Sequence, residues 1–568
     1  MVKKFILPLL ILAVFAGCKK KEPNNNNNNQ GNQGKPTAPN TQHISVLTQH
    51  NDNTRAGLND KENVLNTSNV NSKQFGKLFV LTVDDQVYAQ PLVVGNLSIG
   101  SGTHNVVFIA TVNNTVYAYD GDSGKLYWKQ SYTQSGMRAP TSHDMASSWC
   151  NPYTDFTYDI GIVGTPVIDS AAQTMYFVAR STDGTNYVQY LHAINITNGS
   201  EQAGSPVNIT ASMPGTGDGA VNGVVSFDAR RNNQRQGLTL VNGTVYISYS
   251  SHCDWNPYHG WILGYDAKSL QQKIVYNDTP NGENGGLWES GMGMAADEQG
   301  NLYVTSGNGT VGQGNQYQSS GNGTIDNGVN PDPTDPTDRG ESAMKLSPSG
   351  STLQVASYFT PTNYLDLNNN DLDYGVMGTL LIPNSNFYLT GCKDGNMYLV
   401  NKDNMGGYSS SGNLVQQTIP LNNSMHCQPA YYKGSSGEYV YVWSENDRLR
   451  ALSFDRSSNT FSSNQVIASA SGPTGGCGAT LSVSSSGATD GTGILWAWYA
   501  SSGDAGGSPS PGILRAFDAN DITKELWNSN QVAGDSPGNY SKFCSPTIAD
   551  GKVYLATFSG KVVVYGLK

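Results

Sequence analysis

Three cysteines and one histidine stand where thiol chemistry could occur. Cys427, Cys477 and Cys544 each head a stretch that resembles a β-strand, and His426 adjoins the first of them. Thiolate and imidazole groups suit zinc and other soft metal ions, so these side chains together could form a metal-binding or redox site. No C-x-x-C pair accompanies them, and in an oxidising compartment a disulfide between two of the three is the simpler expectation.

Two further cysteines lie in loops of similar composition. Cys150 stands in the run WCNPY and Cys253 in the run HCDWNPY. They can pair with each other, but sequence alone does not fix the connectivity. The chain has no G-x-S-x-G, H-E-x-x-H or phosphate-loop motif, and no C-x-x-C-H haem motif. Any electrons that the protein handled would therefore need an external acceptor.

These residues belong to a chain of repeated β-type units. The last copy has three alternating apolar runs, at 545–549, 551–556 and 560–565, which are separated by Asp-Gly and Ser-Gly turns. The first copy adds a fourth run at Leu126 to Trp128, and the pattern predicts a meander of antiparallel strands. Eight units follow one another, and their inner strands are predicted to start near Gln90, Thr165, Gly237, Gly291, Gly378, Gln428, Gly478 and Ser545.

The two ends of the repeat array complete each other. The eighth unit ends at Leu567 without an outer strand, whereas Phe75 to Val83 resembles an outer strand that precedes the first unit. Pairing the two would close a ring and remove an exposed edge. An open solenoid would have shorter repeats and no such unpaired strand. We predict an all-β fold for residues 43–568, an eight-bladed β-propeller of four-stranded antiparallel blades in which the N-terminal strand completes the last blade.

The turn sequence AYDGDSGKLYW at 118–128 resembles the repeat of pyrroloquinoline-quinone-type (PQQ-type) β-propellers. The resemblance covers residues from about 75 to 568, and the runs QVYAQPLVV, GIVGTPVID and YHGWILGYD are similar to those of an uncharacterised group of bacterial propeller lipoproteins. The wider family includes quinoprotein alcohol dehydrogenases and non-enzymatic relatives such as the outer-membrane-assembly propeller lipoprotein. The resemblance therefore implies a fold and leaves the reaction open.

For a quinoprotein, the resemblance implies a cation, a catalytic carboxylate, a basic side chain and flat groups around the quinone. Asn308 matches the calcium-binding Asn of the family, and Asp373 matches its catalytic Asp. Lys393 falls where the family places a cofactor-contacting Arg or Lys, and Trp288 matches the aromatic floor of the site. These four residues are the candidates for PQQ and calcium binding.

Other family features are missing. The vicinal cysteine pair would fall near 109–112, where the chain has no cysteine. The calcium-binding Glu would fall in the run 255–261, where the nearest carboxylate, Asp254, is one residue out of register. A hard-cation site that lacks one carboxylate is weakened. We therefore expect no cofactor, with PQQ and calcium as the alternative.

The N-terminus predicts export and lipidation. Lys3 and Lys4 precede an apolar run that is too short to span a bilayer, and Ala16-Gly17-Cys18 resembles a lipobox. Residues 1–18 are predicted to be a lipoprotein signal peptide with Cys18 acylated, and 19–42 an Asn-rich disordered tether. We expect a monomer anchored by lipid in the cell envelope, at the outer membrane because Lys19 rather than Asp follows Cys18.

The composition narrows the partners. Only 14% of residues are charged and the net charge is −11, which argues against nucleic acid as a partner. Three functions fit the residues: a non-enzymatic binding or scaffold propeller for a protein, glycan or small ligand; a PQQ- and calcium-dependent oxidoreductase with Asp373 as base; and a Cys/His metal-binding or redox protein. The first is the leading hypothesis, because it requires no missing residue.

Overall fold

The structure is a computed structural model that describes residues 43–568 except 148–149, 314–331, 422, 469 and 471. The chain divides into two units, Met1–Thr41 and Gln42–Lys568, and the second holds all the described residues. The signal peptide, Cys18 and the tether lie outside them. Across the described part of the chain, no helix is long and apolar enough to cross a membrane.

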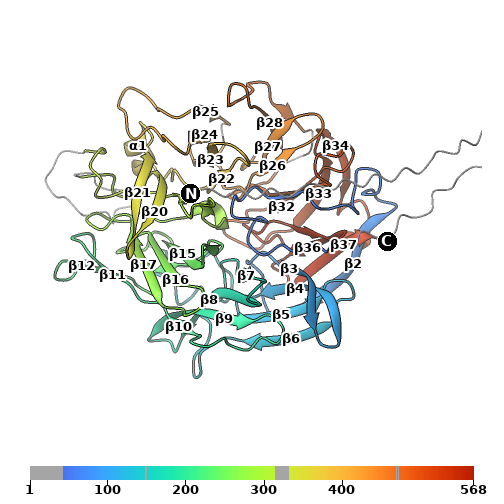
Figure 1. The fold of residues 1–568 in the computed structure, drawn as a ribbon, viewed down its shortest axis with the longest axis horizontal. Helices are drawn as coiled ribbons and strands as arrows, with labels where there is room; N and C mark the ends of the chain where they lie inside the picture. Colours follow the sequence, from blue (N-terminus) through green and yellow to red (C-terminus); the bar gives the residue numbers. More distant parts are fainter. Residues whose placement is uncertain (1–42, 148–149, 314–331, 422, 469, 471) are drawn as a thin grey trace, which may run out of the picture. The chain divides into compact units, whose positions relative to one another are not determined.

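Eight small antiparallel sheets form a ring, as predicted (Figure 1). Each inner strand begins within a few residues of its predicted start, because a Gly, Pro or polar residue there ends the preceding loop. Blade one contains β3 (Leu92–Ile99), β4 (Gly102–Ala110), β5 (Thr115–Asp120) and β6 (Leu126–Ser131), and blade two contains β7 (Val167–Asp169), β8 (Thr174–Thr182), β9 (Tyr187–Asn195) and β10 (Val207–Asn208). Blade three contains β14 (Thr239–Val241), β15 (Thr244–Ser251), β16 (Trp261–Asp266) and β17 (Gln272–Asn277), and blade four contains β18 (Ala295–Ala296), β19 (Leu302–Thr305), β20 (Ala343–Ser349) and β21 (Thr352–Phe359).

The second half of the ring repeats this arrangement. Blade five contains β22 (Leu380–Leu381), β23 (Phe387–Gly391), β24 (Asn396–Asn401) and β25 (Gln417–Pro420), and blade six contains β26 (Ala430–Lys433), β27 (Glu438–Val442) and β28 (Arg450–Asp455), with the short β29 (Thr460–Phe461) and β30 (Val466–Ile467). Blade seven contains β31 (Thr480–Ser484), β32 (Ile494–Ala500), β33 (Gly512–Asp518) and β34 (Asp521–Asn528), and blade eight contains β35 (Thr547–Ala549), β36 (Lys552–Ala556), β37 (Lys561–Leu567) and β2 (Phe75–Thr82). Loops carry β11 (Ser212–Pro214), β12 (Val224–Ser226), β13 (Asn232–Asn233), α1 (Tyr364–Asn369), and the 3-10 turns η1 (Glu289–Gly291) and η3 (Ala533–Asp535).

The predicted closure of the ring is confirmed. Strand β2 pairs antiparallel with β37, in a register that runs from Phe75 opposite Leu567 to Thr82 opposite Lys561. Phe75 is fully buried and its ring lies 5.0 Å from that of Trp527 and 5.4 Å from that of Trp496. The first strand of the propeller therefore joins the last blade through both backbone hydrogen bonds and aromatic packing.

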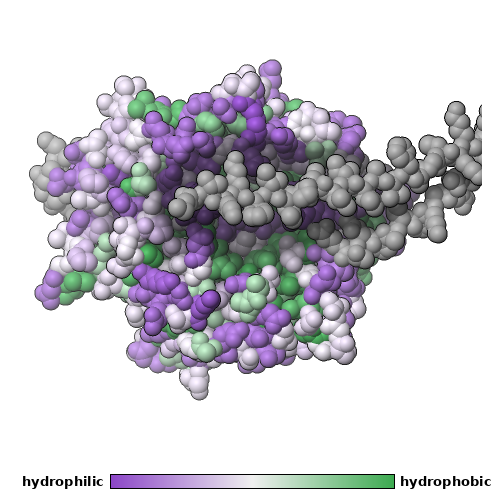
Figure 2. All heavy atoms as spheres, in the orientation of Figure 1, coloured by the Kyte–Doolittle hydropathy of each residue, from purple (hydrophilic) through white to green (hydrophobic). Residues whose placement is uncertain are grey.

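The hydrophobic core is divided among the contacts between neighbouring blades. Eight buried clusters each join the apolar side chains of two adjacent blades, the first with the second and so on around to the eighth with the first. Each blade thus buries both of its faces, which matches the nearly continuous apolar runs of its central strands. The rim of the face seen in Figure 2 mixes hydrophilic residues with residues of intermediate hydropathy and scattered hydrophobic ones.

The sequence did not predict the strap, residues 43–62, which enters the centre of the ring and contacts every blade in turn. Its short strand β1 (Leu58–Asn59) pairs in parallel with β31. Hydrogen bonds tie the strap to Val93, Ile168, Leu238, Ala296, Leu381, Tyr431, Val483 and Ile548, one residue from the inner strand or inner-strand segment of each blade. The strap therefore fills the central channel on one side.

Arg55 fastens this strap from within. Its side chain is fully buried and donates hydrogen bonds to the Thr48 hydroxyl, the Gln49 carbonyl, the Thr239 hydroxyl and the Met294 carbonyl. Burial lowers its pKa to about 10, so the guanidinium stays charged at neutral pH. One side chain thus links the strap to blades three and four.

Candidate functional site

A cavity of about 290 Å³, here called the mouth pocket, opens at the end of the channel where the inner strands begin. Six of its lining residues precede the inner strands of blades three to eight: Arg235, Trp288, Val376, His426, Cys477 and Phe543. The strap bonds to residues farther along these strands, so it lies below the pocket. Ligand can therefore reach the pocket from one side of the ring.

The residues predicted for a quinone site meet in one ionic cluster. Asp373 accepts a hydrogen bond from the backbone N–H of Asn308 at 2.9 Å and forms an ion pair with Lys393 at 2.5 Å. Asp371 accepts a hydrogen bond from the side-chain amide of Asn308 at 2.5 Å, and its carboxylate lies 3.3 Å from the Lys393 ammonium. Asp373, Lys393 and Asp371 line the mouth pocket, as Trp288 does. Three of the four candidates thus lie in its wall, with Asn308 buried behind them.

Asp254, which the sequence places one residue out of register, also lines the pocket. The backbone of the loop that contains Asp254 has positive φ, 55° at Cys253 and 45° at Asp254. This conformation turns the Asp254 carboxyl group toward the pocket. Partial burial and then the charges of Asp373 and Asp371 raise the pKa of Asp254 to about 7. This part of the pocket therefore places Asp254, Asp371 and Asp373 around the Lys393 ammonium.

The electrostatics of this cluster favour a bound cation or proton. Burial alone would lower the pKa of Lys393, but the charges of Asp373 and Asp371 outweigh it and raise that pKa above its usual value. Behind the cluster, burial and the charge of Asp373 raise the pKa of Glu341 well above its usual range. The charged ammonium of Lys393 thus faces more carboxylate charge than it can neutralise. Near neutral pH, protons bound to the carboxyl groups neutralise the rest.

Another part of the pocket lining is aromatic and basic. The Arg235 guanidinium lies 4.7 Å from the centre of the Phe543 ring and 5.7 Å from that of Trp288. It also donates a hydrogen bond to the Trp288 carbonyl at 3.0 Å. Lys542 completes this part and donates to the carbonyl of Gly506 at 2.6 Å. An aromatic ligand could pack here, since stacking and cation–π contacts both act on flat rings.

Strained backbone gathers around the pocket. Phe543 has φ of 61° and Asp371 has φ of 55°, in addition to the two loop residues Cys253 and Asp254. Just below, Glu289 and Ser290 have φ of 44° and 45°. Side chains as large as Phe rarely adopt this conformation, and such strain concentrates at functional sites. The backbone therefore supports the mouth pocket as the working site.

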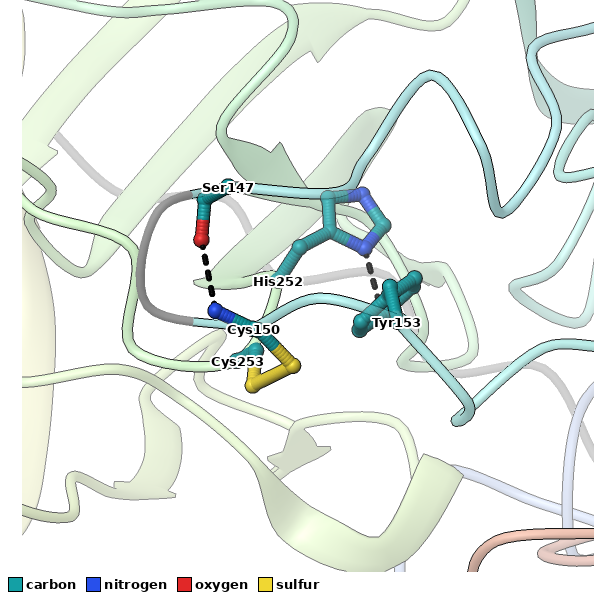
Figure 3. The surroundings of a disulfide bond; sticks show 5 residues. All are labelled: Ser147, Cys150, Tyr153, His252 and Cys253. Carbon is teal, nitrogen blue, oxygen red and sulfur yellow. Dashed lines mark hydrogen bonds between the residues drawn. A yellow bond between two sulfur atoms is a disulfide. The ribbon is translucent and has the colours of Figure 1, made fainter.

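A disulfide between Cys150 and Cys253 braces one side of the pocket (Figure 3). It joins the loop after β6 to the loop after β15, and Cys253 itself lines the pocket. Beside it, His252 contacts the Tyr153 hydroxyl through Nδ1 at 2.8 Å and Arg180 through Nε2 at 2.7 Å. Burial, then the charge of Arg180, lowers the pKa of His252 well below its usual value, so the imidazole is neutral.

The predicted disulfide among Cys427, Cys477 and Cys544 is wrong. All three are free and buried thiols, as is Cys392. Each packs into the core between a different pair of blades, so their side chains point into separate interfaces. Of the three, Cys477 lines the mouth pocket, and burial raises its pKa to about 12. Within the described residues, no group of three or more His, Cys, Asp or Glu side chains is arranged to hold a metal ion.

The cluster can be tested against calcium and PQQ by its chemistry. Asp254, Asp371, Asp373 and the amide of Asn308 are oxygen donors of the kind that a hard cation requires. The Lys393 ammonium, however, already bridges Asp371 and Asp373, and the Arg235 guanidinium lies over Trp288. The described residues therefore match the cofactor pair in donor type but are not arranged to hold the metal ion, and both cations would have to shift to admit the pair.

Comparison with known proteins bears on the fold. A family profile described as "Outer membrane protein assembly factor BamB" matches residues 76–146. The quinohaemoprotein alcohol dehydrogenase ADHIIG from Pseudomonas putida HK5 is 14% identical, with a TM-score of 0.56, and covers 92% of this chain and 80% of its own. That of Comamonas testosteroni is 13% identical, with a TM-score of 0.54 and the same coverage. No curated protein matches the sequence.

The chain is similar to the PQQ-type β-propeller proteins. BamB from Moraxella catarrhalis is 10% identical over 87% of this chain and 98% of its own, with a TM-score of 0.43. The resemblance predicted from the repeat turn is confirmed. The matching family profile is described as BamB whereas the two dehydrogenases are the similar structures, and identities this low establish a fold without choosing between their functions.

Sequence reasoning missed Arg235, Lys542, Phe543 and Asp371 as pocket residues. Arg235 stands two positions before Gly237, and Lys542 three positions before Ser545, the predicted inner-strand starts. The same positional argument that grouped the cysteines could have found them, because every segment ahead of an inner strand reaches the mouth of the ring.

Proposed function

We propose that the protein is a non-enzymatic binding propeller of the cell envelope that holds a small ligand in its mouth pocket. The observation that supports this most is the pocket itself, which is about 290 Å³ in volume and is lined by an ionic cluster and by aromatic and basic side chains. Specific small-molecule sites combine such shape with a few fixed polar groups. A protein or glycan partner would have to use the rim instead.

The ion pair at the centre favours binding over catalysis. Asp373, which would have to accept a proton in a dehydrogenase, is held by Lys393 and by the Asn308 backbone. A general base must be free to reach the proton that it removes. In its present position Asp373 acts as a fixed acceptor, which suits a site that orients a ligand without transforming it.

A ligand-binding measurement tests the proposal. PQQ serves as a planar, anionic probe, and its binding is followed by calorimetry in the presence and absence of calcium. Trp288→Ala should weaken binding at least tenfold because it removes the ring on which the probe packs. Tyr158→Ala is the control, since Tyr158 is an aromatic residue that is 62% exposed and lies outside the pocket. Undetectable binding removes PQQ as the ligand and the PQQ-dependent oxidoreductase with it, whereas binding that Trp288→Ala leaves unchanged contradicts the mouth pocket as the binding site.

The lipid anchor that the sequence predicts would hold this pocket in the cell envelope. An acyl chain on Cys18, followed by the tether 19–42, would hold the ring near a membrane of the exporting cell. The expected state is a monomer.

 Fatty-acid labelling of the full chain should mark the protein, and Cys18→Ser should abolish the label and release the protein from membranes. A variant that keeps its label would overturn the lipid anchor.

A second candidate is a PQQ- and calcium-dependent oxidoreductase, which the convergence of Asp254, Asn308, Asp373 and Lys393 favours. PQQ would supply hydride or electron acceptance when bound. Asp254, Asp371 and Asn308 would hold the cation, Lys393 would bind the cofactor oxygens, and Trp288 would support the ring. Asp373, once Lys393 had turned away from it, would accept the alcohol proton.

Turnover separates the two candidates. The protein is mixed with PQQ and calcium, and dye reduction is followed with simple alcohols and sugars. The binding function predicts no dye reduction above the level of free PQQ. Saturable turnover that Asp373→Ala abolishes, while PQQ still binds, would establish the oxidoreductase and reject the non-enzymatic function.

A further inference from the structure

Arg180 is a buried cation between blades two and three. It lies on β8, and its side chain is only 2% exposed. Because side chains alternate along a strand, Arg180 points to the same side as Tyr176 and Val178, which belong to the buried cluster that joins these two blades. The guanidinium therefore lies inside a blade interface, and it does not line the mouth pocket.

This guanidinium has no carboxylate partner. Among the described residues, no carboxylate oxygen lies within 4.0 Å of its nitrogens. Burial lowers the pKa of Arg180 to about 10, and the neighbours that act on this pKa are the phenols of Tyr249 and Tyr153. Both phenols are neutral, because burial raises their own pKa values well above the usual range. Arg180 thus carries a full positive charge that no nearby carboxylate balances.

The hydrogen bonds of Arg180 do not replace the missing negative charge. Its Nη1 donates to Nε2 of His252 at 2.7 Å, and its Nη2 donates to the side-chain oxygen of Asn233 at 2.9 Å. Both acceptors are uncharged, since burial and then the charge of Arg180 lower the pKa of His252 well below its usual value. The Nε atom is buried and makes no hydrogen bond within the described part of the chain.

Two hydroxyl groups in the same interface also lack partners among the described residues. Tyr249 and Ser251 are fully buried on β15, and neither hydroxyl forms a hydrogen bond there. Tyr249 belongs to the cluster between blades two and three, and Ser251, two positions further along the strand, points to the same side. Tyr249 and Arg180 are near enough to shift the pKa of each other. Three buried donors thus face one interface beside an unbalanced charge.

We propose that a chloride ion binds between blades two and three, with Arg180 supplying the positive charge and Tyr249 and Ser251 donating hydrogen bonds. Buried water could accept these hydrogen bonds, but it could not balance the charge, and an unpaired charge in a protein interior is costly. All three side chains are almost fully buried, which favours a single atom over a carboxylate or a phosphate. The inference goes beyond the proposed function and does not depend on any ligand of the mouth pocket.

The chloride site would support the loops of the mouth pocket from behind. His252 accepts the hydrogen bond of Arg180 and also contacts the Tyr153 hydroxyl (Figure 3). The next residue, Cys253, lines the pocket and is joined to Cys150. An anion that neutralises Arg180 would therefore stabilise the interface from which this loop emerges.

Thermal unfolding of the full chain tests the site. The protein is dialysed exhaustively against sodium gluconate and titrated with sodium chloride at constant ionic strength. The melting temperature should rise by a few degrees and saturate, because an ion that binds only the folded state stabilises it. Tyr249→Phe should weaken the apparent chloride affinity at least threefold, since it removes one donor and keeps the ring. Arg180→Gln should abolish the response.

Tyr176→Phe is the matched control, because the Tyr176 hydroxyl lies in the same interface and donates to the Ala267 carbonyl. It should lower the melting temperature equally in both salts and leave the chloride affinity unchanged. A parent that melts at the same temperature in chloride and gluconate overturns the proposal. So does a chloride response that Tyr249→Phe and Arg180→Gln leave intact.

Bromide provides a direct readout that needs no variant, so it decides the matter even where Arg180→Gln fails to fold. Crystals of the protein grown in sodium bromide should show an anomalous scattering peak beside Arg180 and Tyr249. Peaks at the molecular surface alone would mean an adventitious ion only and would overturn the site.

Discussion

At the scale of single residues, the mouth pocket is an unbalanced set of charges. Asp254, Asp371 and Asp373 surround the single ammonium of Lys393, so this part of the lining holds more negative than positive charge. Holding like charges together without enough counter-charge costs free energy. Stability given up in this way is typical of a binding site.

Asp254 gives this imbalance a measurable pH dependence. Its pKa is raised in the folded protein to about 7 from an ordinary 3.8. Between these values the folded state binds more protons than the unfolded state, so the contribution of Asp254 to stability falls as pH rises. Asp254→Asn should therefore raise the free energy of unfolding at pH 8 by roughly 1–3 kcal/mol, because the partly exposed side chain gives less than the full shift.

Urea unfolding of parent and variant at pH 5 and pH 8 checks this prediction. The difference in free energy of unfolding between parent and variant should be small at pH 5 and largest at pH 8. Asp60→Asn is the control, because Asp60 is exposed, and it should change neither value. A variant that is less stable than the parent at pH 8 would show that Asp254 is charged and paired.

At the scale of elements, the sequence predicted what regular patterns encode. Strand β2 was found because Phe75 to Val83 alternates like an outer strand, and the inner strands because turn residues mark their starts. The strap was not predicted, because its irregular segment forms hydrogen bonds with eight separate blades rather than with a neighbouring strand in the sequence. The pocket was found in part, since Asn308, Asp373, Lys393 and Trp288 followed a family pattern. Asp254 was rejected on register, which a loop with positive φ can absorb.

The closing strand should contribute strongly to stability through Phe75. This side chain is fully buried against Trp496 and Trp527, so Phe75→Ala should lower the free energy of unfolding by about 3–5 kcal/mol. Leu78 lies in the same strand and is 37% exposed, and Leu78→Ala should cost less than about 1 kcal/mol. Denaturant unfolding measures both. Similar losses for the two variants would mean that β2 does not close the ring as described.

The disulfide between the loops of the mouth pocket predicts a thiol count. Cys150 and Cys253 are joined, whereas Cys392, Cys427, Cys477 and Cys544 are free. The denatured protein should therefore gain two reactive thiols on reduction, as measured with a thiol reagent. The double variant Cys150→Ala/Cys253→Ala should show no gain. A gain of four in the parent would mean that a second pair, among the buried cysteines, is also bonded.

At the scale of the whole molecule, the strap makes the ring one cooperative structure. Its backbone bonds to inner strands all around the ring, so disturbing it at one point should loosen blades that are distant from that point. Arg55→Met is the sharpest such change, because it removes the buried guanidinium and leaves the Gln49 carbonyl and the Thr48 and Thr239 hydroxyls without their donor. Loss of a buried, hydrogen-bonded charge of this kind costs about 3–5 kcal/mol.

Hydrogen exchange can show whether this loss is local or general. If the strap couples the blades, Arg55→Met should speed exchange at Leu381, Tyr431 and Val483, whose amides donate to the strap, as well as at blades three and four. Arg515→Met is the control, since Arg515 pairs with Glu525 within blade seven and should affect that blade alone. Faster exchange confined to blades three and four in Arg55→Met would mean that the strap lies in the channel without coupling the blades.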